Sequence, residues 1–179
     1  MKILIATPDD AQNIMNLIEL CTEDMEDQGI YQWNDYYPTL DHIKGSIQDK
    51  SMYIMKENKN YRGIISITEK QPSEYNDMKW LDKTGEILVV TKVAVTPAYQ
   101  KQGIGRKLMD FGENYALEKG YTSIRLDAYS GNPRALDLYE KRRYKKVGKV
   151  YFPMRSLPFY CFEKLTKNYF KSNEIYSIK

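Results

Sequence analysis

One stretch near the middle of the chain limits the possible folds more than any other. Ile87–Val95 is the longest β-branched run and stops at Thr96-Pro97, which predicts a buried strand. Apolar spacing over 104–119, ended by Gly120, predicts a helix, and 121–129 has the pattern of another strand. A strand–helix–strand unit of this kind predicts two parallel strands joined by a right-handed crossover.

Shorter patterns surround this unit. Thr7, Pro8 and Asp10 have the spacing of a capping box, which predicts a helix that Gly29 ends. Asn58-Lys59-Asn60 is a turn between two strand patterns and predicts a hairpin. The other predicted strands are 3–6, 52–55, 63–67, 146–152 and 159–165, and the other predicted helices are 40–48 and 135–142. Together these elements predict a mixed α/β (α+β) fold.

Composition limits the class of protein. Of the 179 residues, 42% are hydrophobic and 28% charged, which indicates a globular chain. We expect a single domain over 1–165 and a polar tail or intersubunit arm over 166–179. No apolar run approaches the ~20 residues that span a bilayer, and Met1–Ala6 is too short for a signal peptide. Cys21 and Cys161 form no spacing motif, which indicates a reducing compartment, so we expect a cytoplasmic protein. Because no apolar run is long enough, we also expect no membrane association.

The segment Gln100–Lys107, with the sequence QKQGIGRK, lies between the predicted buried strand and the following helix. Amides in the first turn of a helix lack partners within the helix, and the helix dipole favours anions there. Gly103 and Gly105 allow the backbone to approach a phosphate closely, while Arg106 and Lys107 add positive charge. The segment therefore predicts a phosphate cradle; a helix start with a solvated basic face is the structural alternative.

Two other glycine-rich phosphate loops are excluded. A Walker loop requires Ser or Thr after a Gly-Lys pair, whereas Gly105 is followed by Arg106 and Lys107. A dinucleotide fingerprint requires a third glycine where this chain has Leu108. The net charge of +3 is too small to predict nucleic-acid binding, and the basic run over 141–146 lacks an aromatic platform.

Two blocks resemble the GNAT superfamily of N-acetyltransferases. The strand and glycine loop over 93–105, VAVTPAYQKQGIG, match the pattern Gln-x-x-Gly-x-Gly, and 132–141, NPRALDLYEK, match the family's second block. The usual Gly-Phe after the second block is Arg143-Tyr144 here, a departure that affects packing more than chemistry. The resemblance implies a mostly antiparallel sheet with a central, splayed parallel strand pair and flanking helices.

The resemblance also implies where acetyl-CoA binds. Its pyrophosphate is expected on the amides of Gln102–Arg106, and its pantetheine arm on the backbone of Val93 and Val95 by strand addition. Asn132 is expected to hydrogen bond to the arm, and Tyr139 to direct its hydroxyl at the thioester sulfur. The cofactor-binding residues implied in this way are Val93, Ala94, Val95, Gln100, Lys101, Gln102, Gly103, Ile104, Gly105, Arg106, Asn132 and Tyr139.

Acetyl transfer requires a neutral amine, and neutralising a lysine-like amine at pH 7 costs about 4–5 kcal/mol. Asp127, twelve residues before Tyr139, is the candidate base because some relatives place an acid there. The alternative is that Asp127 holds the acceptor's ammonium or caps the turn at Asn132. Other relatives carry a glutamate on the earlier strand, where this chain has Val89. Glu86, three residues earlier, would face the opposite side of a regular strand and is not predicted as the base. Proton transfer from Tyr139 to a thiolate is uphill by about 2 kcal/mol, so a hydrogen bond to the sulfur is the safer role; a core tyrosine is the alternative.

The acceptor is the least constrained part of the prediction. The aromatic loop over 31–37 lies where relatives shape the acceptor pocket, so Tyr31 and Trp33 are candidate acceptor residues, with core packing or a dimer contact as the alternative. His42, the only histidine, has no cysteine at ligand spacing, and we expect no metal. The expected enzyme acetylates a primary amine of a small molecule or a peptide N-terminus, with a homodimer as a further expectation; a non-catalytic acyl-CoA sensor domain is the alternative.

Overall fold

The computed structural model describes residues 2–83 and 85–169, which divide into two compact units of interleaved chain. The first unit contains the residues up to Ile67 together with Thr91–Phe111, and the second contains Thr68–Val90 and the residues from Gly112 on. The strands are β1 (Lys2–Ile5), β2 (Met52–Glu57), β3 (Asn60–Thr68), β4 (Ile87–Val95), β5 (Ser123–Tyr129), β6 (Lys145–Val150) and β7 (Phe159–Leu165). The helices are η1 (Pro8–Asp10), α1 (Ala11–Glu26), α2 (Leu40–Gln48), η2 (Ser73–Tyr75), η3 (Pro97–Tyr99), α3 (Ile104–Glu118) and α4 (Pro133–Lys141).

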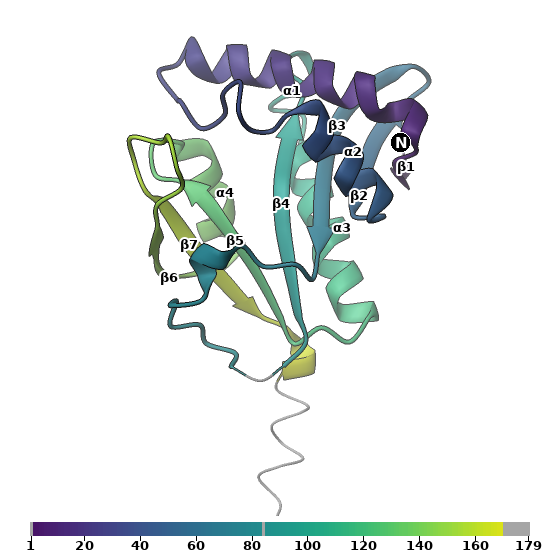
Figure 1. Cartoon of the computed structure of the whole chain (residues 1–179). Helices are drawn as coiled ribbons and strands as arrows, with labels where there is room; N and C mark the ends of the chain where they lie inside the picture. The colour runs from purple at the N-terminus through teal and green to yellow at the C-terminus, as the bar shows by residue number, and fades with distance from the viewer. Residues whose placement is uncertain (1, 84, 170–179) are drawn as a thin grey trace, which may run out of the picture. The chain divides into compact units, whose positions relative to one another are not determined.

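The strands follow the hydrogen-bonded order β1-β2-β3-β4-β5-β7-β6 (Figure 1). β1, β2 and β3 pair antiparallel, as do β5, β7 and β6, whereas β4 and β5 pair parallel. The predicted mixed fold with a mostly antiparallel sheet and one parallel pair is confirmed. A single domain over 1–165 stays a prediction.

In the first unit, the predicted capping box starts the N-terminal helical segment. The Thr7 backbone N–H and hydroxyl both donate to Asp10 Oδ2 at 2.8 Å, and Pro8 opens the turn. Asp10 Oδ1 accepts from Lys56 Nζ at 2.9 Å and from the Tyr61 hydroxyl. Burial opposes ionisation of Asp10, but these donors outweigh it and hold the pKa of the carboxyl well below its usual value. The capping residue therefore also joins η1 to β2 and β3.

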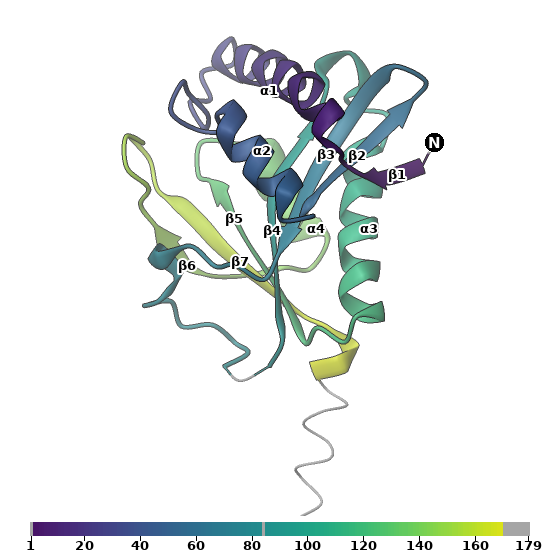
Figure 2. The same cartoon turned by 45° about the vertical axis from the view of Figure 1, so that its right-hand side comes forward.

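The core of the first unit lies between α1, α2 and one face of β2 and β3 (Figures 1 and 2). It is formed by Ala6, Ala11, Ile14, Leu17, Ile18, Cys21, Trp33, Ile43, Ile47, Met52, Ile54, Ile64 and Ala94. Because side chains alternate along a strand, Tyr53 and Gly63 face the other side. There Tyr53 packs against Phe111 of α3 with ring centroids 4.8 Å apart. A Cβ on Gly63 would lie 3.0 Å from Leu108, so the glycine allows α3 to pack closely on β3.

Strand β4 changes its pairing partway along. Its parallel register with β5 covers only Ile87–Val89 against Ser123–Arg125, although both strands continue beyond these residues. Lys92 has a left-handed φ of 48°, which interrupts the regular extended backbone of β4. The predicted splayed pair is thus observed as a short parallel register followed by an irregular strand.

In the second unit, β5 pairs with β7 along its whole length, and α4 follows β5 directly. Asn132 caps α4 by accepting the backbone N–H of Ala135 at 3.1 Å. The helix therefore begins at Pro133, two residues before the predicted start, because proline fits the first helical position. β5 begins at Ser123 rather than at Tyr121, since Gly120 and its left-handed φ of 87° first reverse the chain.

The described chain includes only the first four residues, 166–169, of the predicted tail. Thr166 is buried and donates its hydroxyl to the Tyr121 carbonyl at 2.7 Å, and Asn168 Nδ2 donates to the Leu117 carbonyl at 3.1 Å. The remainder of the predicted tail, 170–179, lies outside the described residues. None of the helices in 2–83 and 85–169 is long and apolar enough to cross a membrane.

Candidate functional site

The predicted phosphate cradle lies in the first unit, at the start of α3. Lys101 and Gly103 adopt left-handed φ values of 60° and 76°, so the loop turns sharply before the helix. The first helical hydrogen bond runs from Lys107 N to the Gly103 carbonyl at 3.1 Å, which leaves the amides of Ile104, Gly105 and Arg106 without partners within the helix. A left-handed residue followed by a helical turn forms a concave nest of N–H groups that suits an anion.

The side chains of this segment divide into exposed and buried ones. Lys101, Gln102, Arg106 and Lys107 are exposed and place positive charge around the helix start. Ile104 is buried and anchors the turn. A Cβ on Gly103 would meet no atom within 4 Å, so this glycine is required by its backbone angle and leaves open space before the amides.

The Gln100 side chain acts within the protein. Its Nε2 donates to Asp24 Oδ2 at 3.1 Å and to the Val95 carbonyl at 3.3 Å. The Cys21 thiol also donates to the Val95 carbonyl, with 3.3 Å between sulfur and oxygen. These contacts connect the loop after β4 to α1 and fix the cradle's position relative to the strand.

The end of β4 is the predicted site of strand addition. Thr96 N donates to the Arg62 carbonyl of β3 at 3.0 Å. Because backbone groups alternate along a strand, those of Val93 and Val95 point away from β3, while the Ala94 side chain is buried in the core. The register with β5 ends at Val89, so Val93 and Val95 lie beyond the parallel ladder.

Asn132 and Tyr139 lie in the second unit, at the start and in the last turns of α4. The Asn132 side chain is half-buried, and its carbonyl oxygen caps the helix by accepting the Ala135 N–H. Tyr139 is buried, and its ring packs against Tyr144 and Phe162 at centroid distances of 5.9 and 6.0 Å. Burial, and then the charge of Asp127, raise the pKa of Tyr139 well above its usual value, so its hydroxyl stays a donor at neutral pH.

Asp127 is half-buried on β5 and contacts a residue that sequence reasoning missed. The hydroxyl of Tyr75, in η2, donates to Asp127 Oδ2 at 2.7 Å. Tyr75 lies in the polar segment 69–83, which carries no motif, and it reaches Asp127 only because the chain folds back over β5. Asn132 caps α4 through its own side chain, and the roles considered for Asp127 stay predictions.

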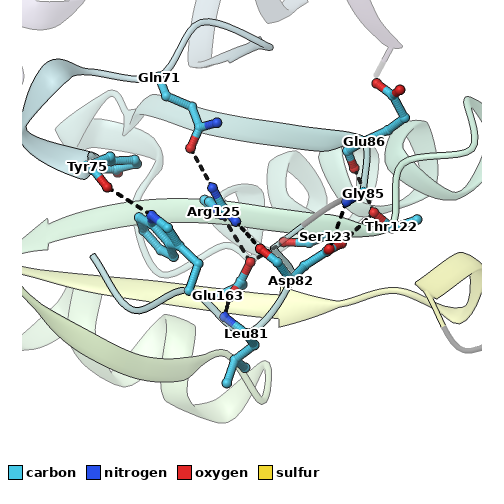
Figure 3. Close-up of polar contacts among 11 residues, drawn as sticks. Gln71, Tyr75, Leu81, Asp82, Gly85, Glu86, Thr122, Ser123, Arg125 and Glu163 are labelled. Atoms are coloured by element: carbon cyan, nitrogen blue, oxygen red, sulfur yellow. Dashed lines mark hydrogen bonds and ion pairs between the residues drawn. The ribbon is translucent and has the colours of Figure 1, made fainter. Parts of the chain in front are cut away.

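The chain from Gln71 to Asp82, here called the strap, is fixed to β5 and β7 by a buried polar network (Figure 3). Arg125 Nε donates to Glu163 Oε1 at 3.0 Å, and its other nitrogens donate to Gln71 Oε1 at 2.7 Å and to the Asp82 carbonyl. The guanidinium also stacks over the Trp80 ring, 4.4 Å from its centroid. Both charged groups of the ion pair are buried, so the strap is held by interactions that exclude water.

The two acceptor residues predicted in the aromatic loop differ in exposure. Trp33 is buried in the core of the first unit, whereas Tyr31 is largely exposed, and both stay predictions as acceptor residues. Glu86 is exposed, and its backbone carbonyl accepts the Thr122 N–H at 2.8 Å. Among the described residues, no three His, Cys, Asp or Glu side chains gather as metal ligands.

The chain resembles known proteins along most of its length. The sequence pattern of the acetyltransferase (GNAT) family matches residues 13–144. The uncharacterised N-acetyltransferase YesJ of Bacillus subtilis is 25% identical over 146 residues, which are 80% of this chain and 81% of that protein. The thialysine N-epsilon-acetyltransferase of Bos taurus is 38% identical over 56 residues, which are 31% of this chain and 33% of that protein.

Solved structures share the fold. A GNAT family acetyltransferase from Streptococcus agalactiae has a TM-score of 0.78 at 19% identity, over 93% of this chain and 95% of that chain. yncA from Salmonella typhimurium, whose structure contains its cofactor acetyl-CoA, has a TM-score of 0.68 at 17% identity, over 92% and 93% of the two chains. Since the family pattern includes both blocks singled out in the sequence and covers most of the residues, the chain belongs to the acetyltransferase (GNAT) family.

Proposed function

We propose that this protein transfers the acetyl group of acetyl-CoA to a primary amine of a small molecule or a peptide, in the cytoplasm, by direct attack. The amine nitrogen forms a bond to the thioester carbonyl carbon, the carbon–sulfur bond breaks, and the sulfur leaves as a thiolate that takes up a proton. The observation that carries the proposal is the open first turn of α3, whose amides follow the left-handed Gly103.

The donor half of the proposal has support from several groups acting together. One exposed charge–dipole contact contributes only about 0.3–1 kcal/mol, so a single amide would not hold a ligand. Here the amides of Ile104–Arg106 and the exposed charges of Lys101, Arg106 and Lys107 are available to one polyanion. The backbone of Val93 and Val95 would pair with the pantetheine arm, which needs no particular side chain.

Tyr139 is proposed to stabilise the departing sulfur by hydrogen bonding. Because its pKa is raised, transfer of its proton to a thiolate is less favourable than for an ordinary phenol. A hydrogen bond to the developing negative charge carries no such penalty and still lowers the barrier. Asn132 would orient the pantetheine arm by a side-chain hydrogen bond.

The acceptor is proposed only as a primary amine. The bovine relative is named for acetylating the side-chain amine of thialysine, which supports a small molecule with a free amino group. A non-catalytic domain that binds acyl-CoA is the second candidate; the buried, family-matched Tyr139 argues against it because a binding domain does not require a donor at the sulfur.

The test measures CoA binding and acetyl transfer separately. Calorimetry with CoA should give binding, and thiol release from acetyl-CoA should appear with at least one member of a panel of amino acids, diamines and peptides. Tyr139→Phe should bind CoA with similar affinity and turn over more slowly. Tight binding without turnover on any amine would favour the sensor, and absence of CoA binding would exclude both candidates.

A further inference from the structure

The strap holds Tyr75 against Asp127 from two sides. The Tyr75 ring packs on Trp80 with centroids 4.8 Å apart, and the Trp80 indole N–H donates to the Tyr75 carbonyl at 3.1 Å. Only 2% of Tyr75 is exposed. Burial, followed by the charge of Asp127, raises the pKa of Tyr75 well above its usual value, so its hydroxyl remains a donor. The phenol cannot turn away from Asp127 without unpacking the strap.

The strap in turn has a fixed anchor on the same face of β5. Arg125 lies two residues before Asp127, so both side chains project from the same side of the strand. Arg125 bonds to the strap at Gln71 and Asp82 and to Glu163 of β7 (Figure 3). The buried network at Arg125 therefore holds the strap in place, and the strap in turn sets the position of the Tyr75 hydroxyl beside Asp127.

We propose that Tyr75 is a positioning residue, which fixes the orientation of the Asp127 carboxylate and favours its ionised form. The part of this inference that concerns turnover rests on the proposed function. A hydrogen bond from a neutral donor stabilises a carboxylate and weakens its hold on a proton. Among the roles that the sequence left open for Asp127, this contact favours holding the acceptor's ammonium over acting as the base, and the amine's proton then leaves to water.

The other titratable groups around Asp127 are a thiol and two phenols, which stay protonated in mildly acidic solution, and an arginine paired with a glutamate. Cys161 stands opposite Asp127 in the β5–β7 register, and burial, then the charge of Asp127, raise the pKa of its thiol to about 12. Tyr139 and Tyr75 are protonated for the same reasons. Arg125 is paired with Glu163, which also accepts from Ser123 at 2.6 Å.

The test compares the unmodified protein with Tyr75→Phe, which keeps the ring against Trp80 and removes only the hydroxyl. Carbon-13 NMR of the aspartate carboxyls, with the Asp127 signal assigned from Asp127→Asn, gives the titration midpoint without any acceptor. We expect Tyr75→Phe to raise this midpoint by about one pH unit. The acidic limb of kcat/KM for the amine should move in the same direction, lowering kcat/KM about tenfold below both midpoints.

Tyr121→Phe is the matched control. Tyr121 is also buried and donates its hydroxyl to a carboxylate, Glu69 Oε1, at 2.6 Å, but it has no contact with Asp127. It should leave both readouts unchanged. An unmoved Asp127 midpoint in folded Tyr75→Phe would overturn the inference. If the Asp127 titration midpoint moved but the pH dependence of kcat/KM did not, or if no amine were acetylated, the role of Asp127 under the proposed function would be overturned. Failure of the Tyr75 inference and failure of the proposed function are therefore distinguishable.

Discussion

The two units contribute chemistry of different kinds. The cradle in the first unit consists of backbone amides placed by the left-handed Lys101 and Gly103 and by the start of a helix, all within a few residues of one another. The carboxylate cluster in the second unit, Tyr75, Asp127 and Tyr139, consists of side chains from a strap, a strand and a helix far apart in the sequence. The cradle residues are mostly exposed, whereas the two tyrosines of the cluster are buried.

This difference predicts how each region responds to change. A site made of local backbone depends on a few φ and ψ angles, so damage to it should stay local. A site made of distant side chains depends on the packing that brings them together, so it should fail when a remote anchor is removed.

The largest effect is expected from Arg125→Met, which removes the anchor of the strap. Breaking a buried ion pair by removing one partner leaves an uncompensated charge and typically costs about 3–5 kcal/mol. We expect a loss of this size in the free energy of unfolding, measured by urea denaturation. CoA binding by whatever protein remains folded should persist if the cradle is local.

The control for Arg125→Met is Lys141→Met. Lys141 pairs with Asp137 at 2.8 Å, but its side chain is 75% exposed, and such a pair contributes about 0.3–0.5 kcal/mol. The double variant Arg125→Met with Glu163→Gln should recover part of the loss, since no buried charge remains unpaired. Equal losses for Arg125→Met and Lys141→Met would contradict the buried network.

The next effect in size concerns Tyr139→Phe, which removes one hydroxyl from the carboxylate cluster. Loss of a hydrogen bond to the departing sulfur should lower kcat about 100-fold, a typical cost for one donor to developing negative charge. Thiol release measured at saturating acetyl-CoA checks this value.

Tyr144→Phe is a matched control for that measurement. Tyr144 packs against the Tyr139 ring, and its own hydroxyl is buried beside Glu113 without a hydrogen bond of good geometry. Its removal should leave kcat unchanged and the stability equal or slightly higher. If both variants slow the reaction alike, Tyr139 acts through packing rather than through its hydroxyl.

The same contrast explains what the sequence could predict. Strand β4 and helix α2 have the predicted bounds, because a β-branched run and an apolar helical repeat each encode their element locally. The capping box at Thr7 and Asp10, the turn before α3 and the Asn132 cap also depend on neighbouring residues. The cradle could be recognised for this reason.

The carboxylate cluster could be predicted only in part. Tyr139 and Asp127 were found through the family resemblance, whereas Tyr75 lies in a polar segment with neither periodicity nor motif. Its contact with Asp127 depends on the strap crossing β5, which Arg125 and Glu163 fix through tertiary contacts. The residues next to Tyr75 in the sequence do not indicate which distant residue it will contact. The left-handed φ of Lys92 in β4 could not be predicted either, because a lysine in the sequence does not indicate a positive φ.

A smaller effect is expected from Gly103→Ala, which tests whether the cradle is local. An L-residue in the left-handed region costs about 1–2 kcal/mol, and a loop that relaxes this strain moves the amides of the first turn. CoA affinity should fall about tenfold by calorimetry. Gly120→Ala is the control, because Gly120 has a similar φ of 87° and equally open surroundings. It should lose similar stability and keep its CoA affinity; a parallel loss of affinity would contradict a local cradle.

The smallest effect is expected from Asp10→Asn, at a residue that combines a local cap with the distant donors Lys56 and Tyr61. The pKa of Asp10 is lowered in the folded chain, so its stabilisation is full above the ordinary value near 3.9 and is lost as the pH falls further. The variant should therefore cost about 1–2 kcal/mol at pH 7 and less at pH 3, by urea denaturation. Asp9→Asn, at an exposed neighbour, should show a small cost at pH 7. If the Asp10 cost were the same at both pH values, the carboxylate's charge would contribute nothing and only its local capping geometry would matter.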